Sequence, residues 1–174
     1  CASAYKRGIS FINIPTTLLA MVDASIGGKL GIDFKHFKNH IGFFREPDHV
    51  FVDAEFLKTL DPRELRSGFA EVIKHSLIAD ASYWPNFAGN NVDNQDWQKH
   101  IEHSIDVKKA VVKSDPTEKG YRKILNFGHT IGHAIENAAG YGRWLHGEAV
   151  AIGMMTATRL SESRGLCARG LSIR

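Results

Sequence analysis

The segment Asn126-Phe127-Gly128-His129-Thr130-Ile131-Gly132-His133 has the most informative spacing in the sequence. His129 and His133 are four residues apart, so on a helix they lie on one face, one turn above the other. Two imidazoles at this spacing can converge on one metal ion, as in zinc sites. Gly128 and Gly132 repeat at the same interval and leave that face low enough for a ligand or a second helix to approach closely. The segment therefore predicts a helix with a metal-binding face.

A third histidine and an acidic residue extend this hypothesis. His146 begins another predicted helix, and a short loop would make the two helices antiparallel neighbours and bring His146 back towards His129. Glu71 and Lys74 are three residues apart in a predicted helix, where they form either a surface ion pair or, for Glu71, the acidic partner of the histidines. The histidines have an alternative interpretation as ordinary core or surface residues. Three of them, at this spacing and beside glycines, favour the metal site.

Helix signals account for most of the chain after residue 60. Asp61 as N-cap, Pro62 in the first turn and Glu64 three residues after the cap predict a helix start, and the apolar stripe continues to about Asp80. The other predicted helices, with the residues that end them, are 97–113 before Asp115-Pro116, 124–139 before Gly140, and 144–164 before Gly165.

The first sixty residues show a mixture of short strand and loop signals. Residues 11–15 and 50–53 are predicted as short strands of a buried sheet, 18–22 as an apolar helix-like stretch, and 27–31 as a flexible glycine-rich turn. The sequence therefore predicts a mainly α chain, with a multi-helical part over 61–174 that follows a short α/β segment over 1–60.

Composition narrows the function classes. The net charge of +3 is too mild to indicate a nucleic-acid partner, and no block of Lys and Arg is present. No apolar run approaches 18 residues and no signal-peptide layout is present, so we expect neither a membrane span nor export. Cys1 and Cys167 lie outside any CxxC motif, which argues against a thiolate metal site and favours a reducing, cytoplasmic setting.

Isolated polar residues add weaker signals. Lys29 ends Gly27-Gly28-Lys29, where backbone amides and an ammonium can meet a phosphate, although a solvated lysine is the ordinary alternative. Asp23 follows an apolar stretch and is either a cap or a site residue.

Several blocks, in one order, resemble the 3-dehydroquinate synthase family. The likeness covers about 7 to 166, and blocks of this length in this order are more specific than any single motif. They are Ile14-Pro15-Thr16-Thr17-Leu18-Leu19-Ala20, Val22-Asp23-Ala24-Ser25-Ile26-Gly27-Gly28-Lys29, Lys38-Asn39 with Ile41-Gly42, Phe56-Leu57-Lys58-Thr59-Leu60, Ala70-Glu71-Val72-Ile73-Lys74, Leu125 to Glu136, and Leu145-His146-Gly147-Glu148-Ala149-Val150.

The resemblance implies a two-domain protein with the active site in the cleft between the domains. Residues 1–60 would be the C-terminal remnant of an NAD-binding α/β domain with the interdomain segment. Residues 61–174 would be a helical metal- and substrate-binding domain, incomplete at its C-terminus. The dinucleotide-binding glycine loop would then lie upstream of Cys1, so we expect the chain alone to be inactive. The full-length enzyme would be a cytoplasmic homodimer.

The reaction implied by the resemblance is that of a lyase in the shikimate pathway, which leads to chorismate and the aromatic amino acids. It converts 3-deoxy-arabino-heptulosonate 7-phosphate to 3-dehydroquinate with elimination of phosphate, using NAD and a zinc or cobalt ion. The partner is thus a small sugar acid phosphate, with no nucleic acid or membrane involved.

The resemblance also implies roles for individual residues. The metal ligands would be Glu71, His129 and His146, whereas helical spacing alone favours His129 with His133. The catalytic set would be Asp23, Lys29, Lys74, Lys108, Glu118 and His133. The substrate would contact Lys29, Asn39, Arg122 and Asn126. Contacts to NAD would come from Thr16, Thr17, Leu19, Asp23, Lys29, Lys38, Phe56, Thr59, Leu60 and Glu64.

Rival hypotheses stay open at this point. Another sugar-phosphate cyclase of the same superfamily would share the metal and NAD chemistry, although Asn39, Arg122 and Asn126 together favour a substrate with a carboxylate. A non-catalytic helical metal-binding module would keep the histidines without the reaction. An iron-dependent alcohol dehydrogenase relative is disfavoured by Glu71 and by the histidine block.

Overall fold

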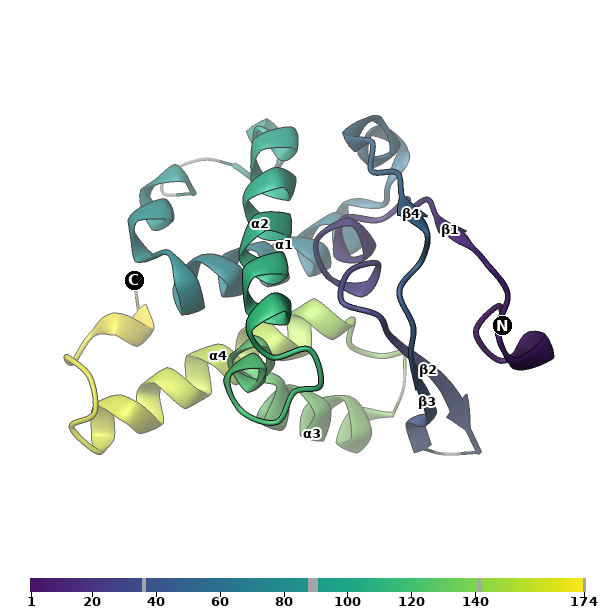
Figure 1. Cartoon of the computed structure of the whole chain (residues 1–174). Helices are drawn as coiled ribbons and strands as arrows, with labels where there is room; N and C mark the ends of the chain where they lie inside the picture. The colour runs from purple at the N-terminus through teal and green to yellow at the C-terminus, as the bar shows by residue number, and fades with distance from the viewer. Residues whose placement is uncertain (36, 88–90, 141, 174) are drawn as a thin grey trace.

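The computed structural model describes residues 1–35, 37–87, 91–140 and 142–173, without the side chains at positions 33, 37, 38, 93 and 173. Four α-helices dominate it, and the N-terminal segment lies to one side of them (Figure 1). The helices are α1 Pro62–Ala79, α2 Trp97–Ser114, α3 His129–Ala139 and α4 His146–Ser163. The predicted mainly helical character is confirmed.

Local signals set the start of α1 and the end of α2, as predicted. Asp61 caps α1 by accepting a hydrogen bond from the Arg63 amide at 2.7 Å, and Pro62 occupies the first turn, where no amide hydrogen is needed. Asp96 caps α2 in the same way, through the Lys99 amide at 3.2 Å. Helix α2 ends at Ser114, because Pro116 disfavours the helical conformation for Asp115 before it.

The predicted start of α3 at residue 124 is wrong. Residues Tyr121–Asn126 form a separate 3-10 helix, η6, and Gly128 adopts a left-handed conformation with φ 81° just before α3 begins at His129. A side chain on Gly128 would also meet the Val150 carbonyl oxygen of α4 at 2.7 Å. The break thus arises from the close approach of another helix, and α4 itself begins at His146, not at the predicted residue 144.

The N-terminal segment holds two small sheets. Strand β1, Ile12–Asn13, pairs in parallel with β4, His49–Val50, and β2, Lys29–Phe34, pairs antiparallel with β3, Phe37–Phe44. The predicted turn over 27–31 is therefore wrong beyond Gly28: Gly27 and Gly28 have φ of 90° and 65°, and a strand follows at once. The short 3-10 and π elements are η1 Tyr5–Arg7, η2 Ala20–Ala24, η3 Ala54–Thr59, η4 Ala81–Asn86, η5 Val92–Asn94 and η7 Leu171–Ile173.

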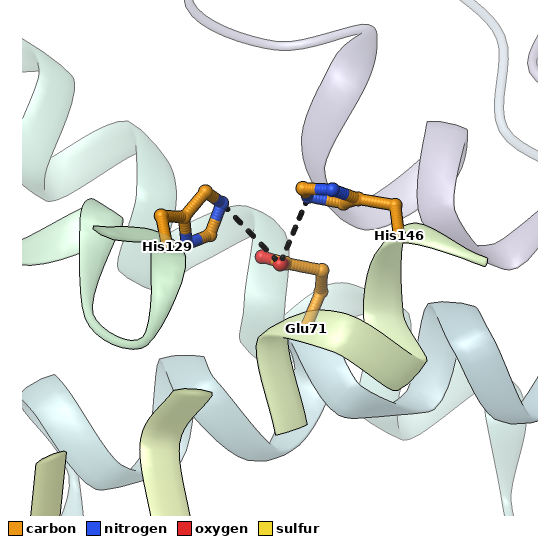
Figure 2. A group of neighbouring side chains, drawn as sticks. All are labelled: Glu71, His129 and His146. Atoms are coloured by element: carbon orange, nitrogen blue, oxygen red, sulfur yellow. Dashed lines mark ion pairs between the residues drawn. The ribbon is translucent and has the colours of Figure 1, made fainter. Parts of the chain in front are cut away.

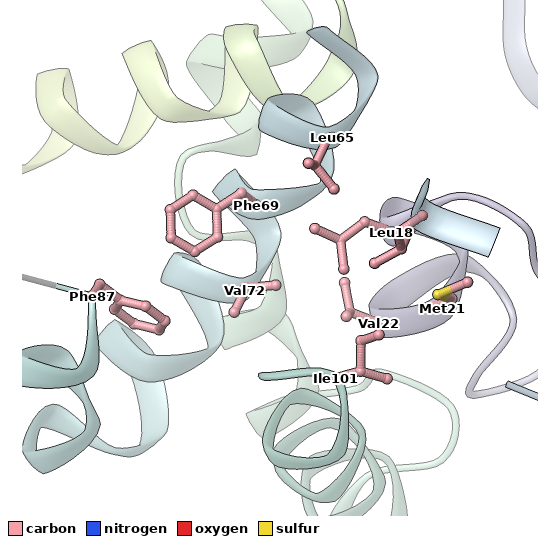
Figure 3. Packing of buried hydrophobic residues seen from close by; sticks show 9 residues of the cluster. Leu18, Met21, Val22, Leu65, Phe69, Val72, Phe87 and Ile101 are labelled. Carbon is pink, nitrogen blue, oxygen red and sulfur yellow. The ribbon is translucent and has the colours of Figure 1, made fainter. Parts of the chain in front are cut away.

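One hydrophobic cluster joins the N-terminal segment to the helices (Figure 3). Leu18, Met21 and Val22, in and just before η2, are fully buried against α1 and α2. The helices contribute Leu65, Phe69 and Val72 from α1 and Ile101 from α2. Because η2 is anchored in this core, Asp23 is held beside the two helices.

Apolar side chains in and beside the parallel strands are exposed in the part of the chain that the structure describes. Ile12 of β1 is 53% exposed, and Ile14 and Phe51, which directly follow β1 and β4, are each 58% exposed. Both strands are shorter than the predicted 11–15 and 50–53. Strands of a parallel sheet are normally buried on both faces. None of the described helices combines the length and the apolar character needed to span a bilayer.

Candidate active site

Three side chains from three helices converge on one point (Figure 2). Glu71 comes from the middle of α1, and His129 and His146 are the first residues of α3 and α4. The Glu71 Oε1 atom lies 3.7 Å from His129 Nε2 and 3.7 Å from His146 Nε2. One carboxylate and two imidazoles are a donor set typical of catalytic divalent metals, with a position left open for a substrate.

The two imidazoles are oriented by their other ring nitrogens. His129 Nδ1 lies 3.2 Å from the Phe127 carbonyl oxygen, and His146 Nδ1 lies 3.3 Å from Glu136 Oε1. Each Nδ1 can therefore donate its hydrogen away from the centre, which leaves the Nε2 lone pair directed at it. Burial, followed by the charge of Lys74, lowers the pKa of His129 to about 4, so this ring is neutral at pH 7.

The two carboxylate oxygens of Glu71 lie in different environments. Oε2 accepts a hydrogen bond from the Lys74 ammonium, whereas Oε1 is buried without a hydrogen-bond partner among the described residues. Burial, followed by the charge of Asp23, raises the pKa of Glu71 in spite of Lys74. A buried carboxylate oxygen without a hydrogen-bond donor, lying between two imidazole nitrogens, fits a bound cation well.

His133 lies next to this centre but in a different group. Its ring centroid is 5.4 Å from that of His129 and 5.9 Å from that of His146, and its side chain is exposed. The ligand atoms of His133, Glu136 and His146 come within 4.8 Å of one another, whereas Glu71 groups with His129 and His146. Tertiary structure therefore places His146, and not His133, with Glu71 and His129.

A cavity of about 150 Å³ opens beside the three converging residues. It contains much of the predicted catalytic and substrate set, and its charge is mainly positive. The lining residues are Asp23, Ala24, Ile26, Lys29, Lys74, Lys108, Arg122, Leu125, Asn126 and His129. An anionic ligand is the natural occupant of such a cavity.

Acidic partners hold the cavity lysines in place. Lys108 donates to the carboxylate and the backbone oxygen of Asp23, and Lys74 donates to Glu71. Burial alone would raise the pKa of Asp23, but the charges of Lys108 and Lys74 outweigh it and hold the pKa well below its usual range. The Asp23 carboxylate thus stays ionised and fixes Lys108 at the cavity wall.

Glu118, another predicted site residue, contacts two of the residues that line the cavity. Glu118, in a left-handed conformation with φ 58°, pairs with Lys29 and accepts a hydrogen bond from Asn126 Nδ2 at 2.7 Å. Burial, followed by the charge of Arg122, lowers the pKa of Lys29. A non-glycine residue held in this conformation is a form of strain that clusters at functional sites.

Arg122 and Asn39, both predicted to bind the substrate, differ in their position relative to the cavity. The Arg122 guanidinium lines the cavity, but its Nη1 and Nη2 groups donate to the backbone oxygens of Pro116 and Gly27, each at 2.7 Å. Arg122 therefore ties η6 to the Gly27 turn. Asn39 lies on the exposed part of β3 and does not line the cavity.

Most residues predicted to contact NAD lie away from the cavity. Thr16, Thr17 and Leu19 lead into η2, Phe56, Thr59 and Leu60 belong to η3 or follow it, and Glu64 is in the first turn of α1. Only Asp23 and Lys29 of this set line the cavity. Lys38 lies in β3, and its side chain falls outside the described residues.

Three polar residues near the centre were missed from the sequence. Glu136 contacts His146, Ser67 accepts a hydrogen bond from the Gly147 amide, and His75 groups with Asp23 and Glu71. Helical spacing places all three on the faces of the ligand helices, because Glu136 lies seven residues after His129, Ser67 four before Glu71 and His75 four after it. It does not reveal the partners of Glu136 and Ser67, which belong to another helix. Burial lowers the pKa of His75 to about 3, and neither of its ring nitrogens has a hydrogen-bond partner among the described residues.

Comparisons with known proteins agree on one family. The profile described as 3-dehydroquinate synthase N-terminal matches residues 1–67, and that described as 3-dehydroquinate synthase C-terminal matches residues 68–173. A 3-dehydroquinate synthase of Campylobacter concisus is 53% identical over 165 residues, which are 95% of this chain and 48% of that protein. The enzyme of Streptococcus sanguinis is 47% identical over 175 residues, with 98% of this chain and 49% of the relative covered.

Solved structures of two other synthases are also similar to this chain, at lower sequence identity. A 2-epi-5-epi-valiolone synthase from Streptomyces hygroscopicus, with NAD+ and Zn2+ bound, gives a TM-score of 0.89 at 33% identity, over 97% of this chain and 48% of that one. A 2-deoxy-scyllo-inosose synthase complexed with carbaglucose-6-phosphate, NAD+ and Co2+ gives 0.88 at 33% identity, over 98% and 49%. The chain spans about half the length of the curated relatives it matches. With two family profiles that together match residues 1–173, the chain belongs to the 3-dehydroquinate synthase family.

Proposed function

We propose that this chain forms part of a 3-dehydroquinate synthase, a carbon–oxygen lyase of the shikimate pathway. The full-length enzyme converts 3-deoxy-arabino-heptulosonate 7-phosphate to 3-dehydroquinate and releases phosphate. One observation carries the proposal: Glu71, His129 and His146 converge beside a lysine-rich cavity. The identities of about one half to 3-dehydroquinate synthases support the choice of reaction.

The converging residues would hold a zinc or cobalt ion. The carboxylate and the two imidazoles are ligands that both metals accept, and structural relatives were solved with Zn2+ or Co2+ together with NAD+. When bound, the metal would polarise a substrate oxygen and NAD would accept a hydride transiently.

The side chains of the cavity bind and orient the anionic substrate. Lys29, Lys74 and Lys108 supply ammonium groups for the phosphate and carboxylate, and charge-assisted hydrogen bonds of this kind are strong. Asn126 is oriented by its bond to Glu118, which leaves the amide oxygen to accept from a substrate hydroxyl. His133, which is exposed and has its ring centroid 5.9 Å from that of His146, would transfer a proton.

The domain layout belongs to the same proposal. Residues 1–60 would be the end of an NAD-binding domain with the interdomain segment, and residues 61–174 part of the helical domain. The exposed positions Thr16, Phe56 and Thr59 would then meet NAD along the edge of the first domain. The full-length enzyme would act as a homodimer in the cytoplasm.

The test uses the full-length protein and two neighbouring lysines of α2. Lys108 is buried at the cavity, whereas Lys109 is exposed. Lys108→Met should lower the rate of phosphate release from 3-deoxy-arabino-heptulosonate 7-phosphate by about 10²-fold or more, because it removes a positioned charge. The control, Lys109→Met, should keep the wild-type rate. Equal rates in the two variants, or no 3-dehydroquinate formed by the wild type, would contradict the proposal.

Another sugar-phosphate cyclase activity is the second candidate. It is favoured by the position of Asn39 outside the cavity and by the engagement of both Arg122 Nη groups with backbone oxygens, since these two residues were predicted to bind a carboxylate. A substrate panel decides between the candidates. Turnover of a sugar phosphate without a carboxylate, such as glucose 6-phosphate, in place of the acid would establish the second one.

A further inference from the structure

Helix α1 meets the first turn of α4 through three successive contacts on one face. The residues of α1 are spaced by four, so they lie one turn apart, and they contact three consecutive residues of α4 in reverse order. The contacts are Arg63 with Glu148, Ser67 with Gly147, and Glu71 with His146. The candidate metal centre is therefore the innermost of three contacts between the same two elements.

The middle contact is a helix cap supplied by another helix. The Gly147 amide is one of the first-turn donors that have no acceptor within their own helix. Leu145, the N-cap residue of α4, has no side-chain oxygen to offer, and the Ser67 hydroxyl accepts this hydrogen bond at 3.0 Å. Ser67 is 1% exposed, so water does not replace it easily.

The two helices are also in close backbone contact here. A side-chain carbon on Gly147 would stand 1.8 Å from the Ser67 carbonyl oxygen, which no real contact allows. Glycine is thus required at this position for the hydroxyl to reach the amide. The contact fixes both the separation and the register of the two helix backbones.

We propose that Ser67 is a positioning residue for the metal centre, and this inference rests on the proposed function of that centre. Ser67 precedes Glu71 by one turn of α1, and its hydrogen-bond partner Gly147 follows His146 directly. One hydrogen bond therefore fixes the backbones of both ligands. The outer contact is bidentate, but it joins the partly exposed side chains of Arg63 and Glu148 and involves no backbone atom next to a ligand.

The test compares two buried serines of α1 in the full-length protein. Ser67→Ala removes the cap, whereas Ser76→Ala removes an equally buried hydroxyl that donates only to Ile73 of its own helix. Zinc affinity is measured by chelator competition, and the absorption spectrum of the cobalt-loaded protein reports the ligand geometry. We expect Ser67→Ala to weaken zinc binding about 10–100-fold, as the loss of an outer partner of a metal ligand does, and to change the cobalt spectrum. Ser76→Ala should match the wild type in both measurements.

A second variant covers the case in which Ser67→Ala does not fold. Ser67→Cys keeps the size of the side chain but offers only a weak acceptor, so it should show the same changes to a smaller extent. Wild-type zinc affinity and spectrum in a folded Ser67 variant, or an equal loss in Ser76→Ala, would overturn the inference and leave the proposed function intact. A wild-type protein that binds neither zinc nor cobalt would overturn both.

Discussion

The buried ion pair between Glu71 and Lys74 allows the structural and the metal-binding roles of one carboxylate to be separated. The side chain of Glu71 is 0% exposed and that of Lys74 1%. Glu71→Gln keeps the shape of the side chain but removes its charge. Two effects should follow: the Lys74 ammonium loses its direct counter-charge, and the three-residue donor set loses its anionic member.

The first effect has a definite size. Removal of one partner of a buried ion pair typically costs about 3–5 kcal/mol, because the other charge stays buried without compensation. We expect a value near the lower end, about 3 kcal/mol, since Asp23 also lies close enough for its charge to act on Glu71 and Lys74. This corresponds to a change of about 10²-fold in the opening equilibrium of α1.

The assay is amide hydrogen exchange of α1 in the full-length protein, with a chelator present so that metal binding does not contribute to stability. Glu71→Gln should lower the opening free energy of α1 by the stated amount. The double variant Glu71→Gln/Lys74→Met removes both charges and should recover much of the loss, because no uncompensated charge then stays buried at this turn.

Metal content separates the second effect from the first. Elemental analysis should find both the single and the double variant depleted of metal, although only the single variant is strongly destabilised. If the double variant opens as easily as the single one, the ion pair is not what stabilises this turn. Full metal content in either variant would refute the assignment of Glu71 as a ligand.

Three further predictions concern histidines and the exposed strands. In the full-length protein, His146→Ala should abolish metal retention, whereas His133→Ala should keep the metal and slow turnover by about 10²–10⁴-fold; an empty His133 variant would exchange their roles. The His75 ring, with a folded pKa of about 3, binds its proton more readily in the unfolded state, whose pKa is near 6.5. Acid therefore favours unfolding, and the free energy of unfolding should fall as the pH drops from about 6.5 towards 3. His75→Phe should make the urea midpoint depend less on pH, and an unchanged pH dependence in this variant would contradict the burial argument. The 174-residue chain should self-associate through residues 1–60, where Ile12 and Phe51 are exposed, and a monodisperse monomer in light scattering, or a dimer formed only by the helices, would disprove this.

Local chemistry explains why α1 and α2 were predictable from the sequence. Asp61 and Asp96 each accept a hydrogen bond from an amide two or three residues ahead, and Pro116 excludes the helical conformation from the residue before it. These effects act within a few residues, so they operate whatever the rest of the chain does. The hairpin of β2 and β3 was missed, because the glycines at 27 and 28 indicated a turn and nothing local showed that pairing begins directly after it.

For the candidate site, the sequence by itself determined which residue types are available and, through resemblance, which of them belong together. Helical spacing alone favoured His129 with His133, because periodicity reports only on neighbours within one helix. The tertiary structure decided that Glu71 and His146 meet His129, since α4 packs against both α1 and Gly128 at distances that only glycine allows. The tertiary structure also identified the partners of Ser67 and Glu136, because each contacts a residue of another helix. Contacts of that kind depend on how the helices pack, which the order of residues within one helix does not show.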